Sequence, residues 1–157
     1  MKVGPRRAIR DCPCHSGERY AACCGPLHAA TRAAASPEAL MRSRYAAFAL
    51  GLGAYLVETL SADHPDREHD ARALGTALSR AKETQRFMGL TILESSADGD
   101  EEGDEGEVTF HARVFERGVD RSFTERSRFR KEAAGWRYTG GNATKHETPP
   151  ASGRGSG

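Results

Sequence analysis

The stretch DCPCHSGERYAACCGP, residues 11–26, is the most distinctive part of this 157-residue chain because it holds all four cysteines. They form two close pairs, Cys12 with Cys14 and Cys23 with Cys24. Two disulfides in so short a segment conflict with the usual Cα separations of roughly 4.4–6.8 Å. Four thiolates can instead close the coordination sphere of one zinc ion and leave no position for a catalytic water. The pattern predicts a structural metal site, for zinc or alternatively iron.

Two other interpretations of the cysteines stay open here: a disulfide framework, and four reduced thiols without a ligand. His15 and His28 are potential substitutes for a cysteine ligand, although four sulfurs already satisfy the ion. Ser16 and Gly17 form a turn signal, after which we expect a short helix over about residues 18–24. So small a segment buries little apolar surface. Metal binding would therefore supply most of its folding free energy, on the order of 10–16 kcal/mol of apparent affinity.

This segment resembles the SEC-C motif, C-x-C-x-S-G-x-x-[YF]-x-x-C-[HC], found at the carboxyl end of the preprotein translocase ATPase SecA and in other bacterial proteins. The matching positions here are Cys12, Cys14, Ser16, Gly17, Tyr20, Cys23 and Cys24. His15 departs from the motif, which more often has Gly or Asn at that position. The knuckle of SecA contacts other proteins, including the SecB chaperone and the ribosome. The resemblance therefore implies docking on a protein partner, such as the ribosome or a component of protein export.

Composition limits the class of protein. The net charge is +1 and 38% of the residues are hydrophobic, which favours a globular domain over a dedicated nucleic-acid binder. No run of apolar residues reaches the roughly 18 that a membrane-spanning helix needs, and the amino terminus lacks the apolar middle of a secretory signal. Free thiols gathered for a metal fit a reducing compartment. We therefore expect a cytoplasmic bacterial protein without a membrane span.

Changes in composition divide the chain into four parts. We expect a flexible basic arm at residues 1–10, a metal knuckle at 11–28, an α+β domain at 36–141 and a disordered tail at 142–157. The domain begins with Ser36 and Pro37, a favourable cap and first residue for a helix that ends at Gly51. Two further helices are expected over about residues 53–60 and 67–82.

After the third predicted helix the apolar period changes to two, which indicates strands. We expect four of them, at residues 86–95, 107–116, 120–131 and 135–138. Helices followed by an antiparallel meander form an α+β pattern. The third strand would present an outward stripe of Thr124, Arg126, Arg128 and Arg130. RNA phosphates are a possible partner for this stripe, but a solvated face is the preferred interpretation because no aromatic platform is evident beside it.

Two charged residues are expected to face the core. Arg44 follows Met41 by three residues and so lies on the apolar face of its helix, while Glu125 alternates with Phe123 on the inner face of its strand. Because lone charges facing a core are costly, we predict that Arg44 and Glu125 form a buried or half-buried ion pair. With Tyr45 nearby, they are also candidates for the polar floor of a ligand pocket.

From Cys12 to Gly140 the sequence resembles the YchJ-type bacterial proteins, in which a SEC-C knuckle precedes a domain of the nuclear transport factor 2-like superfamily. The likeness is carried by CCGPLH (23–28), LMRSRYAAF (40–48), FTERSRF (123–129) and GWRYTGG (135–141). It implies a small knuckle of four cysteines followed by a cone of about three helices on a curved four-stranded antiparallel sheet. The sequence departs from the family where Phe87 and Met88 replace a frequent tryptophan.

The resemblance does not supply an activity, because the superfamily hosts both enzymes and binding modules. No catalytic motif is recognisable, since the metal claims every cysteine and the histidines are scattered. We therefore expect a metal-binding protein-interaction or chaperone-like adaptor. The alternative is a small-molecule binding protein or enzyme that uses the cone pocket.

Overall fold

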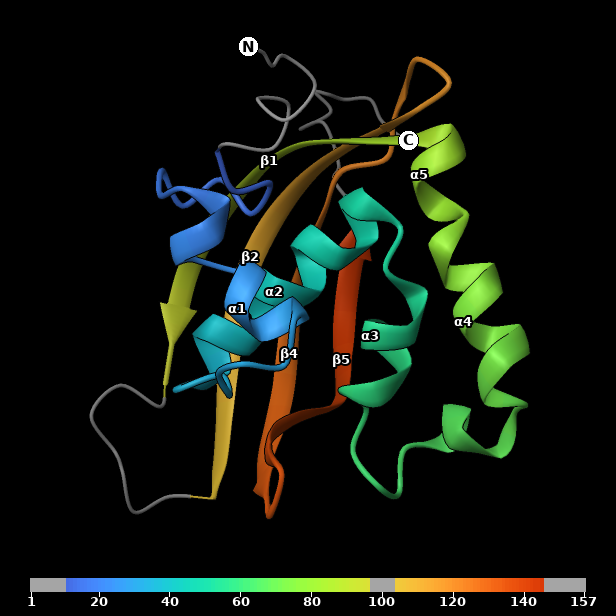
Figure 1. Ribbon diagram of the computed structural model, residues 1–157. Coiled ribbons are helices and arrows are strands. Elements are labelled where there is room, and N and C mark those ends of the chain that lie inside the picture. Colours follow the sequence, from blue (N-terminus) through green and yellow to red (C-terminus); the bar gives the residue numbers. More distant parts are fainter. Residues whose placement is uncertain (1–10, 97–103, 146–157) are drawn as a thin grey trace, which may run out of the picture.

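The computed structural model describes residues 11–96 and 104–145 (Figure 1). The predicted basic arm at 1–10 and the end of the predicted tail, 146–157, lie outside the described residues. The helices are η2 (Tyr20–Ala22), α1 (Gly25–His28), α2 (Pro37–Leu50), α3 (Gly53–Glu58), η3 (Pro65–Glu68), α4 (Ala71–Ser79) and α5 (Ala81–Thr84). The strands are β1 (Gln85–Ser95), β2 (Glu105–Glu116), β3 (Val119–Asp120), β4 (Phe123–Glu132) and β5 (Gly135–Lys145).

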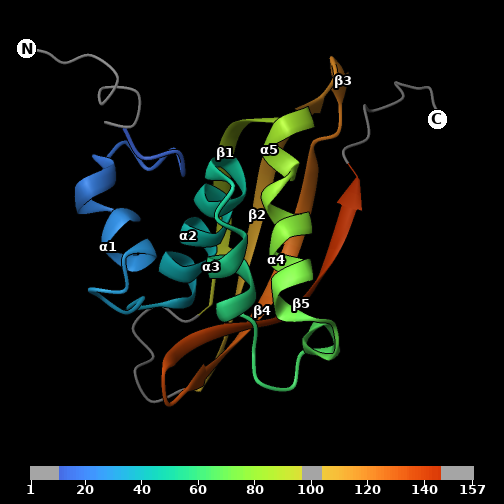
Figure 2. The same ribbon diagram turned by 45° about the vertical axis from the view of Figure 1, so that its right-hand side comes forward.

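The strands form one antiparallel sheet in the order β1-β2-β4-β5, and the short β3 pairs with the end of β2. Helices α2, α3 and α4 lie on one face of this sheet, while the cysteine-bearing knuckle lies to one side (Figures 1 and 2). Register shifts in β1 and in the β4–β5 pair interrupt the regular ladder, as bulges that bend a sheet do. The α+β architecture agrees with the prediction, and β3 is additional.

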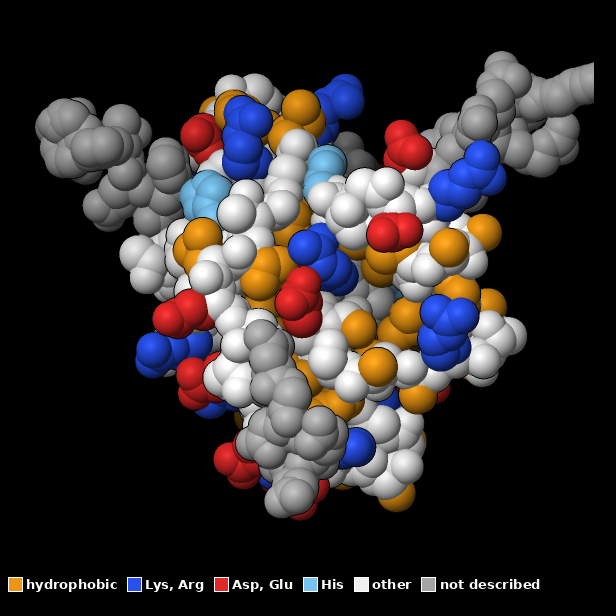
Figure 3. Space-filling model, turned by 90° about the vertical axis from the view of Figure 1, so that its left-hand side faces the viewer, with side chains coloured by type: hydrophobic (Ala, Val, Ile, Leu, Met, Phe, Trp, Pro, Cys, Tyr) orange, Lys and Arg blue, Asp and Glu red, His pale blue; other side chains and the backbone are white. Residues whose placement is uncertain are grey.

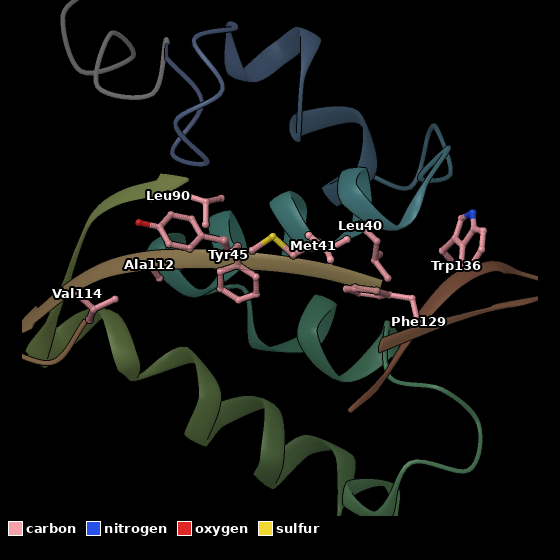
Figure 4. Packing of buried hydrophobic residues seen from close by; sticks show 10 residues of the cluster. Leu40, Met41, Tyr45, Leu90, Ala112, Val114, Phe129 and Trp136 are labelled. Carbon is pink, nitrogen blue, oxygen red and sulfur yellow. The ribbon is translucent and has the colours of Figure 1, made fainter. Parts of the chain in front are cut away.

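Alternation along β2 builds the core. Every second side chain, Val108, Phe110, Ala112 and Val114, is buried, which agrees with the period of two predicted for residues 107–116. They pack against Leu40, Met41 and Tyr45 of α2, with Phe129 of β4 and Trp136 of β5 completing the cluster (Figure 4). Full burial of a large apolar side chain contributes roughly 1.5–3 kcal/mol, so this cluster fixes α2 across the sheet.

Helix α2 begins and ends where the sequence predicts. The Ser36 side chain accepts a hydrogen bond from the backbone N–H of Ala39 at 3.1 Å, and Pro37 occupies the first turn. At the other end, Gly51 has a left-handed backbone with φ of 78°, and its N–H bonds back to the last turn. A side chain at Gly51 would be strained there, so glycine ends the helix cleanly.

The structure corrects two predicted helices. The helix expected over 67–82 is divided into η3, α4 and α5, with breaks at His69–Asp70 and at Arg80. Asp70 caps α4 by accepting from Ala73 N at 2.9 Å, which starts a new helix within the predicted one. The helix expected over 18–24 is also wrong, because η2 covers only 20–22 and α1 begins after Cys24.

The predicted start of disorder at residue 142 is wrong. Strand β5 continues through Asn142 to Lys145, past the predicted boundary at residue 142. Its extension pairs with the start of β4, Arg126 opposite Asn142 and Phe123 opposite Lys145. Ladder hydrogen bonds therefore order a segment whose composition alone suggests disorder. No helix in the described part of the chain is long and apolar enough to cross a membrane.

Candidate functional site

The four cysteines converge on one point. Their Sγ atoms all lie within 4.8 Å of one another, with Cys14 and Cys23 3.6 Å apart and Cys23 and Cys24 3.9 Å apart. A zinc ion with Zn–S bonds of about 2.3 Å requires S–S separations of about 3.8 Å in an ideal tetrahedron. All four cysteines are free thiols, and three of them are buried. The donor set and spacing fit one tetrahedral metal ion and do not fit disulfides.

The backbone of the knuckle explains how so short a segment gathers four sulfurs. Cys12 N donates to Glu18 O at 2.9 Å and His15 N to Cys12 O at 3.1 Å, which fold the first pair into a tight turn. His15 sits in the left-handed region with φ of 63°, which explains why Gly or Asn suits this motif position. The Ser16 hydroxyl lies 3.3 Å from Cys23 Sγ and accepts from Glu18 N at 3.1 Å.

The thiols strongly affect one another's ionisation. Hydrogen bonding with Cys14 raises the pKa of Cys12 to about 11, and hydrogen bonding with Cys12 raises the pKa of Cys24 and lowers that of Cys14. Four thiolates at this separation repel one another, so they need a central cation to be deprotonated together. Arg42 adds a further positive charge, since its Nη1 donates to Cys14 O at 3.1 Å and lies 3.8 Å from Cys14 Sγ.

The knuckle packs on the rest of the protein through two histidines. His28 Nε2 donates to Ser43 O of α2 at 2.8 Å, so its Nδ1 accepts from the Tyr20 hydroxyl at 2.7 Å. Burial lowers the pKa of His28, which keeps the imidazole neutral. The His15 ring lies edge-on to Tyr45 at 5.8 Å, and its Nε2 is 3.4 Å from Phe87 O. Neither histidine belongs to the sulfur cluster.

A second candidate site is a cavity of about 310 Å³ between the helices and the sheet. Its walls are mostly apolar, from Met41, Phe48, Leu60, Leu78, Phe110, Phe123 and Phe129, and its polar lining is Arg44, Tyr45, Asp66, Glu125, Ser127 and Tyr138. The structure therefore brings the three predicted pocket residues, Arg44, Tyr45 and Glu125, to one cavity. A ligand for them stays a prediction.

The predicted ion pair between Arg44 and Glu125 is wrong, since no such pair is found among the described residues. Tyr138 contacts both side chains instead. The Arg44 guanidinium donates to Leu56 O at 2.8 Å and to Thr59 Oγ1 at 2.6 Å, and it lies 4.6 Å from the centre of the Tyr138 ring. The Tyr138 hydroxyl donates to Glu125 at 2.9 Å. Each charge is thus satisfied separately, by carbonyl, hydroxyl and aromatic partners.

These contacts set the ionisation of the cavity floor. Burial lowers the pKa of Arg44 to about 10, so the guanidinium stays charged at neutral pH. Burial, and then the Glu125 charge, raise the pKa of Tyr138. The Glu125 carboxylate also accepts from the Ser127 hydroxyl at 2.7 Å. Burial raises the pKa of Tyr45, whose hydroxyl donates to Gly89 O at 3.0 Å. Tyr45 is therefore held by β1 and stays protonated at neutral pH.

Tyr138 and Asp66 line the cavity although the sequence did not predict them there. Tyr138 follows the buried Trp136 by two residues. Residues two apart on a strand lie on the same face, so this spacing could have indicated that Tyr138 faces inward. Asp66 lies in η3, an irregular segment without a periodic pattern. Part of the predicted basic stripe is neutralised: Arg126 pairs with Glu107 at 3.5 Å, and Arg130 pairs with acidic side chains.

Comparisons with known proteins agree with both parts of the chain. Residues 11–26 match the model of the SEC-C motif, and residues 36–141 match the model described as YchJ, middle NTF2-like domain. A UPF0225 protein of Geobacter sulfurreducens is 37% identical over 134 residues, which cover 85% of this chain and 80% of that protein.

Solved structures show the same fold. The solution structure of a SEC-C motif containing protein from Rhodopseudomonas palustris is 44% identical, covers 85% of this chain and 98% of that one, and has a TM-score of 0.70. A ketosteroid isomerase-like protein from Erwinia carotovora atroseptica, 20% identical, covers 73% of this chain and 97% of that one, with a TM-score of 0.52. The second likeness concerns the fold alone. With its SEC-C knuckle and its matched middle domain, this chain belongs to the YchJ family of NTF2-like proteins.

Proposed function

We propose that this protein is a metal-stabilised interaction module, in which the four cysteines hold one zinc ion and the resulting knuckle docks on a protein partner. The observation that carries the proposal is the convergence of all four Sγ atoms within 4.8 Å. A closed sphere of four thiolates leaves no open position for substrate, so the metal would stabilise a surface and not perform catalysis.

The surface around the cysteines supports docking. Asp11, His15, Glu18 and Arg19 are exposed, so charges of both signs border the metal site. On the side of the molecule that carries the knuckle and β1, hydrophobic, charged and histidine side chains are interspersed (Figure 3). Mixed surfaces of this kind suit transient protein contacts, which are about as polar as ordinary protein surface. The partners we propose are the ribosome or a component of protein export, by likeness to the SEC-C knuckle of SecA.

Metal analysis tests the first half of this proposal. Protein purified without chelator should contain about one zinc per chain, because one tetrahedral site uses all four ligands. The Cys23→Ser/Cys24→Ser variant should contain none. About one iron per chain in place of zinc would mean that the site binds iron. Near-zero metal together with four titratable thiols would refute it.

Co-sedimentation with purified ribosomes tests the docking half. Wild-type protein should move into the ribosomal fraction, whereas the Cys23→Ser/Cys24→Ser variant should remain at the top of the gradient. The Glu18→Ala variant changes the exposed surface of the knuckle without removing a ligand, so it separates loss of docking from loss of metal. Equal sedimentation of wild type and the cysteine variant would exclude the knuckle as the ribosome contact. Affinity capture from a bacterial lysate, with and without chelator, would then be required to find another partner.

A second candidate function is the binding of a small amphipathic molecule in the cavity, favoured by its apolar walls and its charged floor. The probe is 8-anilinonaphthalene-1-sulfonate, whose fluorescence rises in apolar sites. Leu78→Trp should fill part of the cavity and reduce probe binding, whereas Leu74→Trp, also on α4 but outside the cavity lining, should not. Glu125→Gln removes the charge but keeps an acceptor for the Tyr138 hydroxyl. Loss of probe binding with unchanged stability would identify Glu125 as a pocket residue. Loss of stability alone would identify it as a structural residue.

A further inference from the structure

A second surface feature lies apart from both sites described above. It is a groove of about 950 Å³ along α5, the start of β1 and the end of β2. Four cationic residues line it, Lys82, Arg86, Arg113 and Arg117, against one acid, Glu83. Each of these five side chains is exposed. The groove therefore concentrates positive charge in a chain whose net charge is only +1.

These cations differ from the arginines of the predicted outward stripe. Arg126 and Arg130 of that stripe are ion-paired with acidic side chains at 2.6–3.5 Å. Within residues 11–96 and 104–145, none of the ion pairs includes a cation of the groove. Unpaired cations keep their full charge for a partner and lose only their counterions on binding.

An aromatic ring lies between the arginines. Phe115 stands opposite Arg86 in the β1–β2 register, so the two side chains share one face of the sheet. The Arg113 guanidinium lies 5.6 Å from the centre of the Phe115 ring. Opposite Arg113 is Gly89, and the stem of Arg113 packs over it, 3.7 Å from where a Cβ would lie. Packing therefore positions the guanidinium beside the ring, and the ring forms an aromatic platform among the cations of the groove.

We propose that this groove binds single-stranded RNA, with the four cations contacting phosphates and Phe115 stacking on a base. Arginine-rich grooves with aromatic platforms are the physical basis of sequence-tolerant single-strand binding. The groove is bounded by α5, the start of β1 and the end of β2. An acidic peptide would leave the ring unused.

The proposal is independent of the metal-stabilised docking proposed above, because no cysteine lines the groove. The two surfaces nevertheless adjoin, since Phe87 lines the groove and its carbonyl oxygen contacts His15 of the knuckle at 3.4 Å. A partner that contains both protein and RNA would be able to engage both surfaces.

Fluorescence anisotropy of a 5′-labelled oligouridine tests the proposal on the full-length, metal-loaded chain. Four phosphate contacts to a single strand predict a slope of log affinity against log salt of about −2.8, or roughly 50-fold weaker binding at 200 mM than at 50 mM salt. Arg86→Gln and Arg113→Gln should each make the slope shallower by about 0.7. Phe115→Leu should weaken binding at least about threefold with the slope unchanged, because stacking carries no charge.

Matched variants control for net charge. Arg72→Gln on α4 and Arg126→Gln on β4 remove the same charge outside the groove and should leave the affinity within twofold of wild type. Thermal unfolding of each variant shows that it is folded. The proposal is overturned if Arg113→Gln binds like Arg72→Gln, or if Phe115→Leu has no effect. Equal competition by hexaglutamate would also overturn it, because the groove would then be a general site for acidic polypeptides.

Discussion

At the scale of single residues, His28 joins the knuckle to the rest of the molecule. It donates to Ser43 O, accepts from the Tyr20 hydroxyl, and packs edge-on against Tyr55 at 4.7 Å. Tyr55 in turn bonds to the Ser43 hydroxyl at 2.7 Å. The imidazole thus uses both nitrogens within a polar network, which a second proton on Nδ1 would break.

This network predicts a dependence of stability on pH. Burial lowers the pKa of folded His28 below its ordinary value of 6.5, so below pH 6.5 the unfolded chain takes up a proton that the folded chain resists. The stability contributed by the neutral His28 is fully present above pH 6.5, and it is lost as the pH falls toward the pKa of His28 in the folded chain. Between pH 7.5 and 5.5 the wild type should lose up to about 1.4 kcal/mol more unfolding free energy than His28→Gln.

Urea unfolding followed by the fluorescence of Trp136, the only tryptophan, measures this difference. At pH 7.5 His28→Gln should itself be less stable, by about 1–3 kcal/mol, because it leaves polar partners unsatisfied. Parallel pH profiles for the two would show that His28 titrates alike in the folded and unfolded chain, contrary to this expectation.

At the scale of elements, helices α3 and α4 approach each other closely at two glycines, Gly53 and Gly75. A Cβ on Gly53 would collide with the backbone oxygen of Gly75 and the side chain of Ser79, whereas a Cβ on Gly75 would lie 3.5 Å from its nearest neighbour, at ordinary contact distance. The two glycines therefore differ, although they face each other. The close approach at Gly53 holds α4, whose Leu78 forms a wall of the cavity.

Alanine substitutions distinguish these two glycines. Gly53→Ala should destabilise the protein by about 1–3 kcal/mol, since the helices must separate to admit the methyl group. Gly75→Ala should be neutral or stabilising by up to about 1 kcal/mol, because alanine favours the helix interior. Thermal unfolding of both variants is the measurement. Equal destabilisation would mean that the packing of α3 on α4 is not limited by Gly53.

The elements also show which parts of the fold were predictable. The strands and α2 follow from local signals: alternation at Val108–Val114, the cap at Ser36 and the stop at Gly51. The break in the helix predicted over 67–82 has a local signal in Asp70, which caps α4, whereas the end of β5 depends on pairing with β4. Such long-range contacts leave no periodic mark in their own segment. The cysteine cluster was predictable because spacing alone defines it, whereas the Tyr138 bridge between Arg44 and Glu125 joins three elements.

At the scale of the whole molecule, α2 separates the two candidate sites. One of its faces meets the knuckle, where Arg42 contacts Cys14, Ser43 contacts His28, and Ala46 packs among the cysteines. Its other face lines the cavity with Met41, Arg44, Tyr45 and Phe48. Helix α2 therefore contacts both the knuckle and the cavity, while the contacts between β4 and β5 lie beyond it.

This arrangement predicts which residues change when the metal is removed. The four cysteines proposed to hold the metal lie in a local segment, so chelation should unfold residues 11–28 without unfolding the sheet. Because α2 contacts that segment directly, amide signals of residues 42–46 should shift as well, which a fully separable knuckle would not cause. Signals from β4 and β5, including Phe129 and Trp136, should stay in place because their packing involves no cysteine.

Two-dimensional amide spectra with and without chelator provide the measurement, and re-addition of zinc should restore the original signals. The Cys12→Ser/Cys14→Ser variant is the matched control, since chelator should leave its spectrum unchanged. Loss of signal dispersion throughout residues 85–145 would mean that the metal holds the whole fold together. Shifts confined to residues 11–28 would instead mean that the contacts of Arg42 and His28 do not couple the knuckle to α2.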